Sequence, residues 1–141
     1  MGLSLEQIVG RLEDPETPIV WLDPSLPEDL WTGLPDAVQQ RGYRVLKLDE
    51  GLPISDLASL VDAVASAAAA PLPSDKSQTG LRDCLLQLPH YGKGWVIVFH
   101  CPEALRQNDE RAFEDFLEIL ELVHETRYET HQQVFKLVVR D

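Results

Sequence analysis

The side chains best suited to chemistry are two cysteines and two histidines in the second half of the chain, Cys84, His90, His100 and Cys101. Their spacing, C-x5-H-x9-H-C, matches no compact zinc pattern. Adjacent residues of a strand point to opposite faces, so His100 and Cys101 would not converge on one metal ion. We therefore expect neither a metal site nor a cofactor, and we interpret Cys84 and Cys101 as small hydrophobic residues.

A nucleophilic cysteine is the second kind of chemistry to weigh. Cys101 follows the predicted strand Trp95–His100, at the sheet edge where open α/β folds place their ligands. Arg106 completes a C-x4-R spacing similar to that of rhodanese-type loops. However, Pro102 removes a backbone donor from this loop, and Glu103 would repel a bound anion. A small Cys101-dependent enzyme is therefore kept as an alternative, which rapid alkylation of Cys101 near neutral pH would support.

The charge balance restricts the class of partner. The chain has 141 residues, enough for one domain, with 12 basic and 24 acidic side chains and a formal net charge of −12. Such a surface repels nucleic-acid phosphates and anionic lipid, and it attracts basic proteins. The sequence shows neither a secretory signal pattern nor an apolar run of the roughly 18 residues that a membrane span needs, so we expect a cytoplasmic protein. It does not indicate an oligomeric state.

Four stretches rich in β-branched and aromatic residues are predicted to be strands, and several are almost continuously apolar. Such runs are typical of parallel strands that are covered on both faces, and helical patterns separate them. The sequence thus predicts an α/β fold with a small, mostly parallel sheet of three or four strands flanked by helices. The predicted strands are Ile19–Asp23, Tyr43–Leu48, Trp95–His100 and Val134–Val139.

Helices are predicted from apolar spacing and from capping residues. Pro35 divides one helical region into two short helices, and Ser55 is the expected N-cap of another. A polar, proline-rich segment over 71–78 is predicted to be a loop, and Gly92 and Gly94 a turn. The predicted helical regions are Leu5–Leu12, Glu28–Arg41, Ser55–Ala70, Leu81–Leu88 and Asp109 to about Tyr128.

The last predicted helix has an unusual row of acidic residues. At about 100° per residue, five glutamates fall within about 80° of each other, and no lysine is interleaved. The opposite face is apolar and would cover the sheet. The row is either a solubilising face or an electrostatic docking surface for a basic partner. Its members are Glu110, Glu114, Glu118, Glu121 and Glu125.

From Tyr43 to the C-terminus the chain resembles the barstar family of intracellular ribonuclease inhibitors. The motifs ISDL at Ile54–Leu57 and DCL at Asp83–Leu85 are the most specific matches, and the order of strands and helices agrees. The resemblance covers about two-thirds of the chain. It implies one domain over residues 1–141, with a barstar-like core at 43–141 and an N-terminal extension at 1–42. The extension would add a fourth strand.

The resemblance also implies a binding surface. In the family, an acidic short helix and the loop before it enter the active-site groove of a ribonuclease, and an aspartate takes the place of the substrate phosphate. That aspartate corresponds here to Asp83. Thr79 stands where the family has a second aspartate, Arg82 stands where it has an aromatic residue, and Asp75 supplies acidity in the preceding loop. Glu118 and Glu121 are candidates for a glutamate contact on the last helix.

The function predicted from these residues is that of a barstar-like inhibitor or immunity protein. It would bind and block a basic partner, a ribonuclease or another nuclease toxin, without catalysis. It would not contact nucleic acid or a membrane directly. The alternative is a non-inhibitory protein-interaction module with the same fold, whose binding would depend less on salt.

Overall fold

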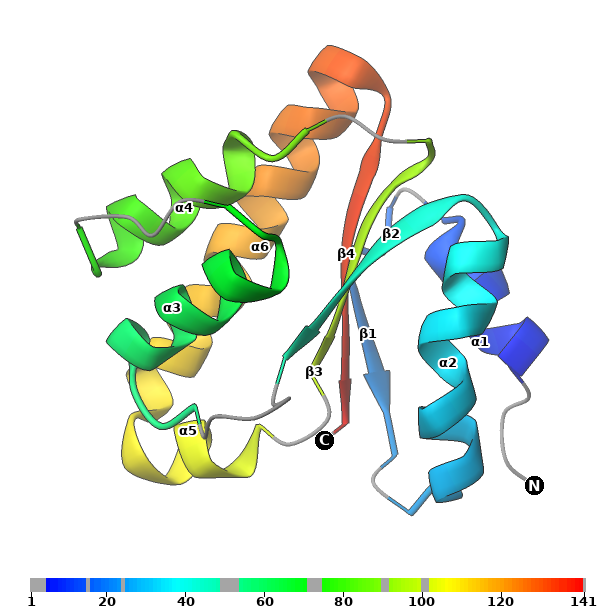
Figure 1. Ribbon diagram of the computed structural model, residues 1–141, viewed down its shortest axis with the longest axis horizontal. Helices are drawn as coiled ribbons and strands as arrows, with labels where there is room; N and C mark the ends of the chain where they lie inside the picture. Colours follow the sequence, from blue (N-terminus) through cyan, green and yellow to red (C-terminus); the bar gives the residue numbers. More distant parts are fainter. Residues whose placement is uncertain are drawn as a thin grey trace.

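The computed structural model describes residues 5–14, 16–23, 25–48, 54–70, 75–89, 92–99 and 102–140. Within these ranges it contains one parallel sheet with the strand order β1-β4-β3-β2 (Figure 1). The predicted α/β fold with a small parallel sheet is confirmed, and the sheet has four strands. They are β1 (Ile19–Leu22), β2 (Tyr43–Leu48), β3 (Gly94–Phe99) and β4 (Val134–Arg140).

The two central strands are the most apolar, as expected for strands covered on both faces. Every residue of β3 is buried, and so is every residue of β4 except Arg140. At the sheet edge, β1 ends one residue earlier than predicted, because the Asp23 carboxylate accepts a hydrogen bond of 2.8 Å from the Ser25 N–H and turns the chain. β3 begins one residue earlier than predicted, at Gly94, and β4 continues to Arg140.

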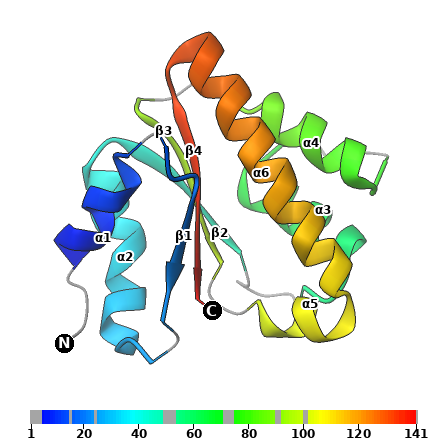
Figure 2. The same cartoon turned by 180° about the vertical axis from the view of Figure 1, so that it is seen from behind.

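Helices cover both faces of the sheet and create two apolar cores. Figures 1 and 2 show α1 and α2 on one face and the other four described helices on the opposite face. In agreement, Val96 and Val98 pack with the first pair, whereas Trp95, Ile97 and Phe99 pack with the second group. The helices are α1 (Leu5–Leu12), α2 (Glu28–Gln40), α3 (Leu57–Ala67), α4 (Gln78–Leu86), α5 (Glu103–Asn108) and α6 (Glu110–His131).

The prediction of two short helices around Pro35 is wrong, because α2 is one continuous helix with Pro35 inside it. A proline within a helix removes one backbone hydrogen bond and crowds the preceding turn. Here Pro35 lies on the buried face, together with Trp31, Leu34 and Val38. Burial of these side chains against the sheet holds the helix together across the proline.

Other helix boundaries also differ from the prediction, and α3 and α4 end at Ala67 and Leu86, three and two residues earlier than expected. The N-cap of α3 is Asp56 and not Ser55, because Asp56 and Ser59 form a reciprocal capping box. Helix α4 begins at Gln78 and not at Leu81, so the last residue of the predicted loop is helical. Helix α5 was not among the predicted helices. Within the described ranges, no helix is both long and apolar enough to cross a membrane.

Helix α6 agrees with the predicted amphipathic pattern. Asp109 is its N-cap, its side chain accepting a hydrogen bond of 3.1 Å from the Ala112 N–H, and the helix ends at His131, three residues beyond the expected position. The predicted apolar face is buried or half-buried, and all five glutamates of the row are exposed. The buried face comprises Phe113, Phe116, Leu117, Leu120 and Val123.

A lysine lies inside the core between β4 and the N-terminal segment. Lys136 is completely buried, and its ammonium donates to the backbone carbonyls of Asp14 and Thr17 in the loop between α1 and β1. Burial lowers the pKa of Lys136 from 10.5 to about 8, against a smaller opposing effect from Asp14. The buried ammonium therefore ties the N-terminal segment to a central strand.

This lysine predicts a pH dependence of stability. Between pH 8 and pH 10.5, the unfolded chain keeps a proton that folded Lys136 has lost, so the free energy of unfolding rises with pH. We expect a rise on the order of 2 kcal/mol relative to Lys136→Met, measured by denaturant titration at each pH. The variant provides the reference because burial raises the pKa of Tyr43, which opposes the effect at high pH in both proteins. Parallel profiles for the two proteins would contradict this prediction.

Candidate functional site

Helix α4 lies on the outer side of the molecule, packed against α6 (Figure 2). Its residues Leu81 and Leu85 have no exposed surface and belong to the core. Since a helix turns about 100° per residue, Thr79 and Asp83 lie on the opposite side, where both are exposed. The helix therefore has a fixed inner face and an outward face that is open to a partner.

The C-terminal end of α4 is held by a buried arginine of α6. The Arg127 side chain is 1% exposed. Its guanidinium donates hydrogen bonds of 2.9–3.3 Å to the carbonyls of Leu85, Leu86, Leu88 and Pro89. A cation at a helix C-terminus also interacts favourably with the helix dipole. Burial lowers the pKa of Arg127, but an arginine titrates so far above neutral pH that its side chain stays charged.

The N-terminal end of α4 is held by two side-chain contacts. The Gln78 amide donates to the Asp115 carboxylate of α6 at 2.5 Å. Just before the helix, Lys76 forms an ion pair with Asp62 of α3. Because both ends of α4 are attached to neighbouring helices, its outward face is positioned before any partner arrives.

On that outward face, Asp83 is the central acidic group. Its side chain is 52% exposed, and one carboxylate oxygen lies 3.6 Å from Nε of Arg82. Thr79 is one turn earlier on the same side of the helix, as an i,i+4 neighbour. Arg82 is half-buried, so its charge lies beside Asp83 and partly balances it. An exposed pair of this kind contributes little to stability and can exchange partners at low cost.

Asp75 lies in the segment that leads into α4. Hydrogen bonds from the hydroxyl and the N–H of Ser77 lower the pKa of the exposed Asp75 carboxyl, which keeps it ionised. Its backbone passes directly over Gly80, where an added β-carbon would overlap the Asp75 carbonyl oxygen. The structure therefore places the backbone of Asp75 beside the first turn of α4, against Gly80.

The two glutamates predicted on α6 are both exposed, but they differ in direction. Asp115 marks the side of α6 that faces α4, because it accepts the Gln78 hydrogen bond. Around the helix axis, Glu118 lies about 60° from Asp115, and Glu121 lies about 120° from Asp115 in the same direction of rotation. Glu118 is thus on the shoulder next to α4, whereas Glu121 points away from it.

Sequence reasoning missed two residues that position the site, Arg127 and Gly80. Arg127 is a charged residue on the apolar face of α6, about 40° around the helix from Val123. A charge at such a position was the sequence signal that could have indicated a buried role. Gly80 is a glycine inside a helix, which often marks a close approach of another part of the backbone. Neither pattern shows which distant segment is involved.

The cysteine and histidine candidates are only partly placed. His90, His100 and Cys101 lie outside the described residues, so the structure does not test a reaction at Cys101. Cys84 is half-buried in α4, and burial raises the pKa of its thiol. A raised pKa makes the reactive thiolate scarcer at neutral pH.

The parallel sheet, the anchored helix α4 and the exposed glutamates of α6 define a small α/β protein with an acidic helical surface. The family model described as Barstar (barnase inhibitor) matches residues 43–140, from the first residue of β2 to the last residue of β4. The chain belongs to the barstar family. Comparisons with curated proteins and with solved structures gave no match. The family description is that of an inhibitor, which indicates a protein as the partner.

Proposed function

We propose that this protein is a non-catalytic inhibitor that binds a basic nuclease through the outward face of α4 and the segment before it. The observation that supports this most directly is the exposed Asp83 on an anchored helix, within the residues that match the barstar family. We assign Asp83, Thr79, Arg82 and Asp75 to the contact surface. Glu118 extends this surface on α6.

The chemistry of such a contact is that of an anion mimic. A nuclease holds substrate phosphates with arginine, lysine and histidine side chains, and a carboxylate can accept the same charge-assisted hydrogen bonds. Asp83 can do so because its ion pair with Arg82, with Nε and the carboxylate oxygen 3.6 Å apart, lies at the surface and is easily exchanged. On binding, Asp83 would exchange this neighbour for cations of the partner.

Two physical features favour rapid and strong association. The anchoring of α4 at both ends reduces the ordering that binding requires. The net charge of −12 attracts a basic partner over long distances and raises the association rate at low salt. The pair formed by barnase and barstar is the established example of such electrostatic steering.

The setting and the domain organisation are also proposed here. We place the inhibitor in the cytoplasm, since two cysteines cannot build a disulfide framework. We further propose that residues 1–42 form an extension of one domain. This agrees with the pairing of β1 with β4 in the same sheet and with the burial of Lys136 under the α1–β1 loop.

Charge reversal at Asp83 tests this function. We expect Asp83→Lys to weaken partner binding by at least about 30-fold, because an unpaired charge in an interface costs roughly 2–5 kcal/mol. The partner is captured from cell lysate at low salt with the tagged wild-type protein and identified by mass. Its nuclease activity is then titrated with each variant.

Asp36→Lys, an exposed position on α2, is the matched control and should inhibit like wild type. Arg82→Ala should bind the basic partner more tightly, because it removes a repulsive charge. If the captured protein has no nuclease activity, or binds wild type and Asp83→Lys equally at all salt concentrations, the inhibitor proposal fails. The non-inhibitory interaction module then becomes the better description.

A further inference from the structure

Strand β1 forms one edge of the sheet, and half of its backbone groups face away from its neighbour. The Pro18 carbonyl accepts a hydrogen bond of 2.9 Å from the Leu137 N–H of β4. The backbone N–H and C=O groups of successive residues point to alternate sides of a strand, so those of Val20 and Leu22 also point toward β4. The N–H and C=O groups of Ile19 and Trp21 therefore point outward along the edge, where another strand can pair with them.

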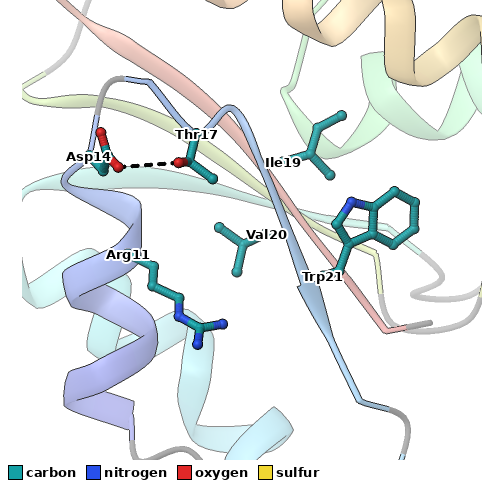
Figure 3. Close-up of a pocket in the computed structure, with 6 residues that line it drawn as sticks. All are labelled: Arg11, Asp14, Thr17, Ile19, Val20 and Trp21. Atoms are coloured by element: carbon teal, nitrogen blue, oxygen red, sulfur yellow. Dashed lines mark hydrogen bonds between the residues drawn. The ribbon is translucent and has the colours of Figure 1, made fainter.

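A hollow of about 370 Å³ runs along this edge (Figure 3). It is lined by the consecutive residues Ile19, Val20 and Trp21. In Figure 3 Val20 points toward α1, whereas Ile19 and Trp21 point to the other side of the strand. Because side chains from both faces of the strand line the hollow, the hollow lies along the strand edge itself. Its remaining lining residues are Arg11, Asp14 and Thr17.

Trp21 makes this edge unusually apolar for a surface strand. Its side chain is 45% exposed, although it packs edge-on against Phe113 of α6 with ring centroids 6.2 Å apart. Trp31 and Trp95 are both buried. A partly exposed indole can contact a lysine or arginine side chain through cation–π attraction.

Three members of the glutamate row of α6 lie on the same side of the molecule as this edge. Phe113 marks the side of α6 that meets β1, and Glu110 is its i−3 neighbour on the helix surface. Glu114 and Glu121 lie about 100° and 80° from Phe113, on the flank turned away from α4. A cation on this side is Arg106, which lies over the Phe113 ring at 5.3 Å. The edge is therefore bordered on the α6 side by these three carboxylates and the Arg106 guanidinium.

We propose that the β1 edge and the adjacent glutamates form a second binding surface, which takes a basic, extended segment of a partner protein as an added strand. The outward backbone groups of Ile19 and Trp21 would supply the hydrogen bonds of strand addition. Alternate side chains of the segment would point toward α6, where lysine or arginine can contact Trp21 and the carboxylates. The side chains between them would face Arg11 and Asp14, whose opposite charges balance each other.

The charge distribution favours this occupant over a second copy of the chain. Two copies joined edge to edge would bring two chains of net charge −12 together, with a glutamate row on each. Repulsion between two surfaces of the same charge opposes their association. The surface lies on β1 and on the flank of α6 next to β1, and it shares no residue with the α4 surface proposed above.

A synthetic peptide that alternates lysine with valine tests the proposal with the full chain. Tryptophan fluorescence and calorimetry should both show saturable binding, and the fluorescence change should be lost in Trp21→Phe. The same peptide, N-methylated at the residues that face β1, keeps its charge but loses two ladder hydrogen bonds. We expect it to bind at least about tenfold more weakly.

Protein variants separate charge from strand addition. Replacing Glu110, Glu114 and Glu121 together with glutamine should weaken peptide binding at least about tenfold. The matched control changes three other exposed acids, Asp29, Asp36 and Glu129, to the amides and should have a much smaller effect. Asp83→Lys should bind the peptide like wild type, which distinguishes this proposal from the function proposed for α4.

Two results would overturn the inference. Equal binding of the N-methylated and parent peptides would show that charge alone attracts the peptide and that no strand is added. Concentration-dependent dimerisation that buries Trp21, measured by sedimentation, would show that a second copy occupies the edge instead.

Discussion

Replacing Arg127 with methionine is expected to lower the free energy of unfolding by about 4 kcal/mol. The substitution removes the donors for four carbonyls at the end of α4 and leaves those acceptors buried. Methionine is apolar and of similar length, so the loss reports the hydrogen bonds more than the packing. Equilibrium denaturation measures the stability, and amide exchange in α4 reports whether this helix loosens first.

Two variants make the Arg127 result specific. Arg127→Lys keeps the charge but lacks the planar fork that reaches several carbonyls, so it should recover only part of the loss. Arg111→Met lies on the same helix, where its side chain is 86% exposed, and should change stability by less than about 0.5 kcal/mol. Equal stabilities for Arg127→Met and Arg111→Met would contradict the anchoring role.

Replacing Gly80 with alanine is expected to destabilise the protein by about 3 kcal/mol and to disturb the proposed binding surface. The added methyl group would overlap the Asp75 carbonyl oxygen, which is backbone and cannot rotate away like a side chain. Either the Asp75 segment or the first turn of α4 must move. Denaturation gives the stability, and titration with the captured partner gives the loss of affinity.

Gly10→Ala provides the comparison for Gly80. Gly10 lies in helix α1, and an added β-carbon there meets no atom within 4 Å. Alanine is the better helix former, so this variant should be more stable than wild type by roughly 0.5–1 kcal/mol. If Gly80→Ala also gains stability, the close approach of Asp75 does not constrain α4.

Local patterns were sufficient for most of the fold. The apolar runs of β3 and β4 indicated strands covered on both faces, and in the structure the residues of these strands are buried, apart from Arg140. The spacing of Phe113, Phe116 and Leu120 indicated the inner face of α6, and these residues are buried. Such patterns are readable because burial against a sheet imposes a period on each element separately.

Local patterns were less reliable where packing competes with backbone preference. Pro35 indicated two short helices, but burial of the side chains around it stabilises one continuous helix. Ser55 was a reasonable N-cap by residue type, yet Asp56 takes the position because Ser59 completes its capping box. In the first of these cases tertiary burial outweighs the local preference, and in the second a reciprocal hydrogen bond decides between neighbours.

The candidate site shows the same division. The position of Asp83 on a short helix and the acidity of the surface were available from the sequence alone. The direction of Glu121 away from α4 was not, because it depends on how α4 and α6 pack. The order of the strands, which leaves β1 at an edge, also depends on that packing.

By itself, the sequence determined the fold class, the acidic surface and the barstar-like motifs that carry Asp83. Only the tertiary structure decided which distant groups meet. Arg127 reaches carbonyls about forty residues earlier, and Lys136 reaches the loop at Asp14, 122 residues away. The physical reason is that periodicity records whether a side chain is buried, whereas the identity of its neighbours follows from the packing of whole elements.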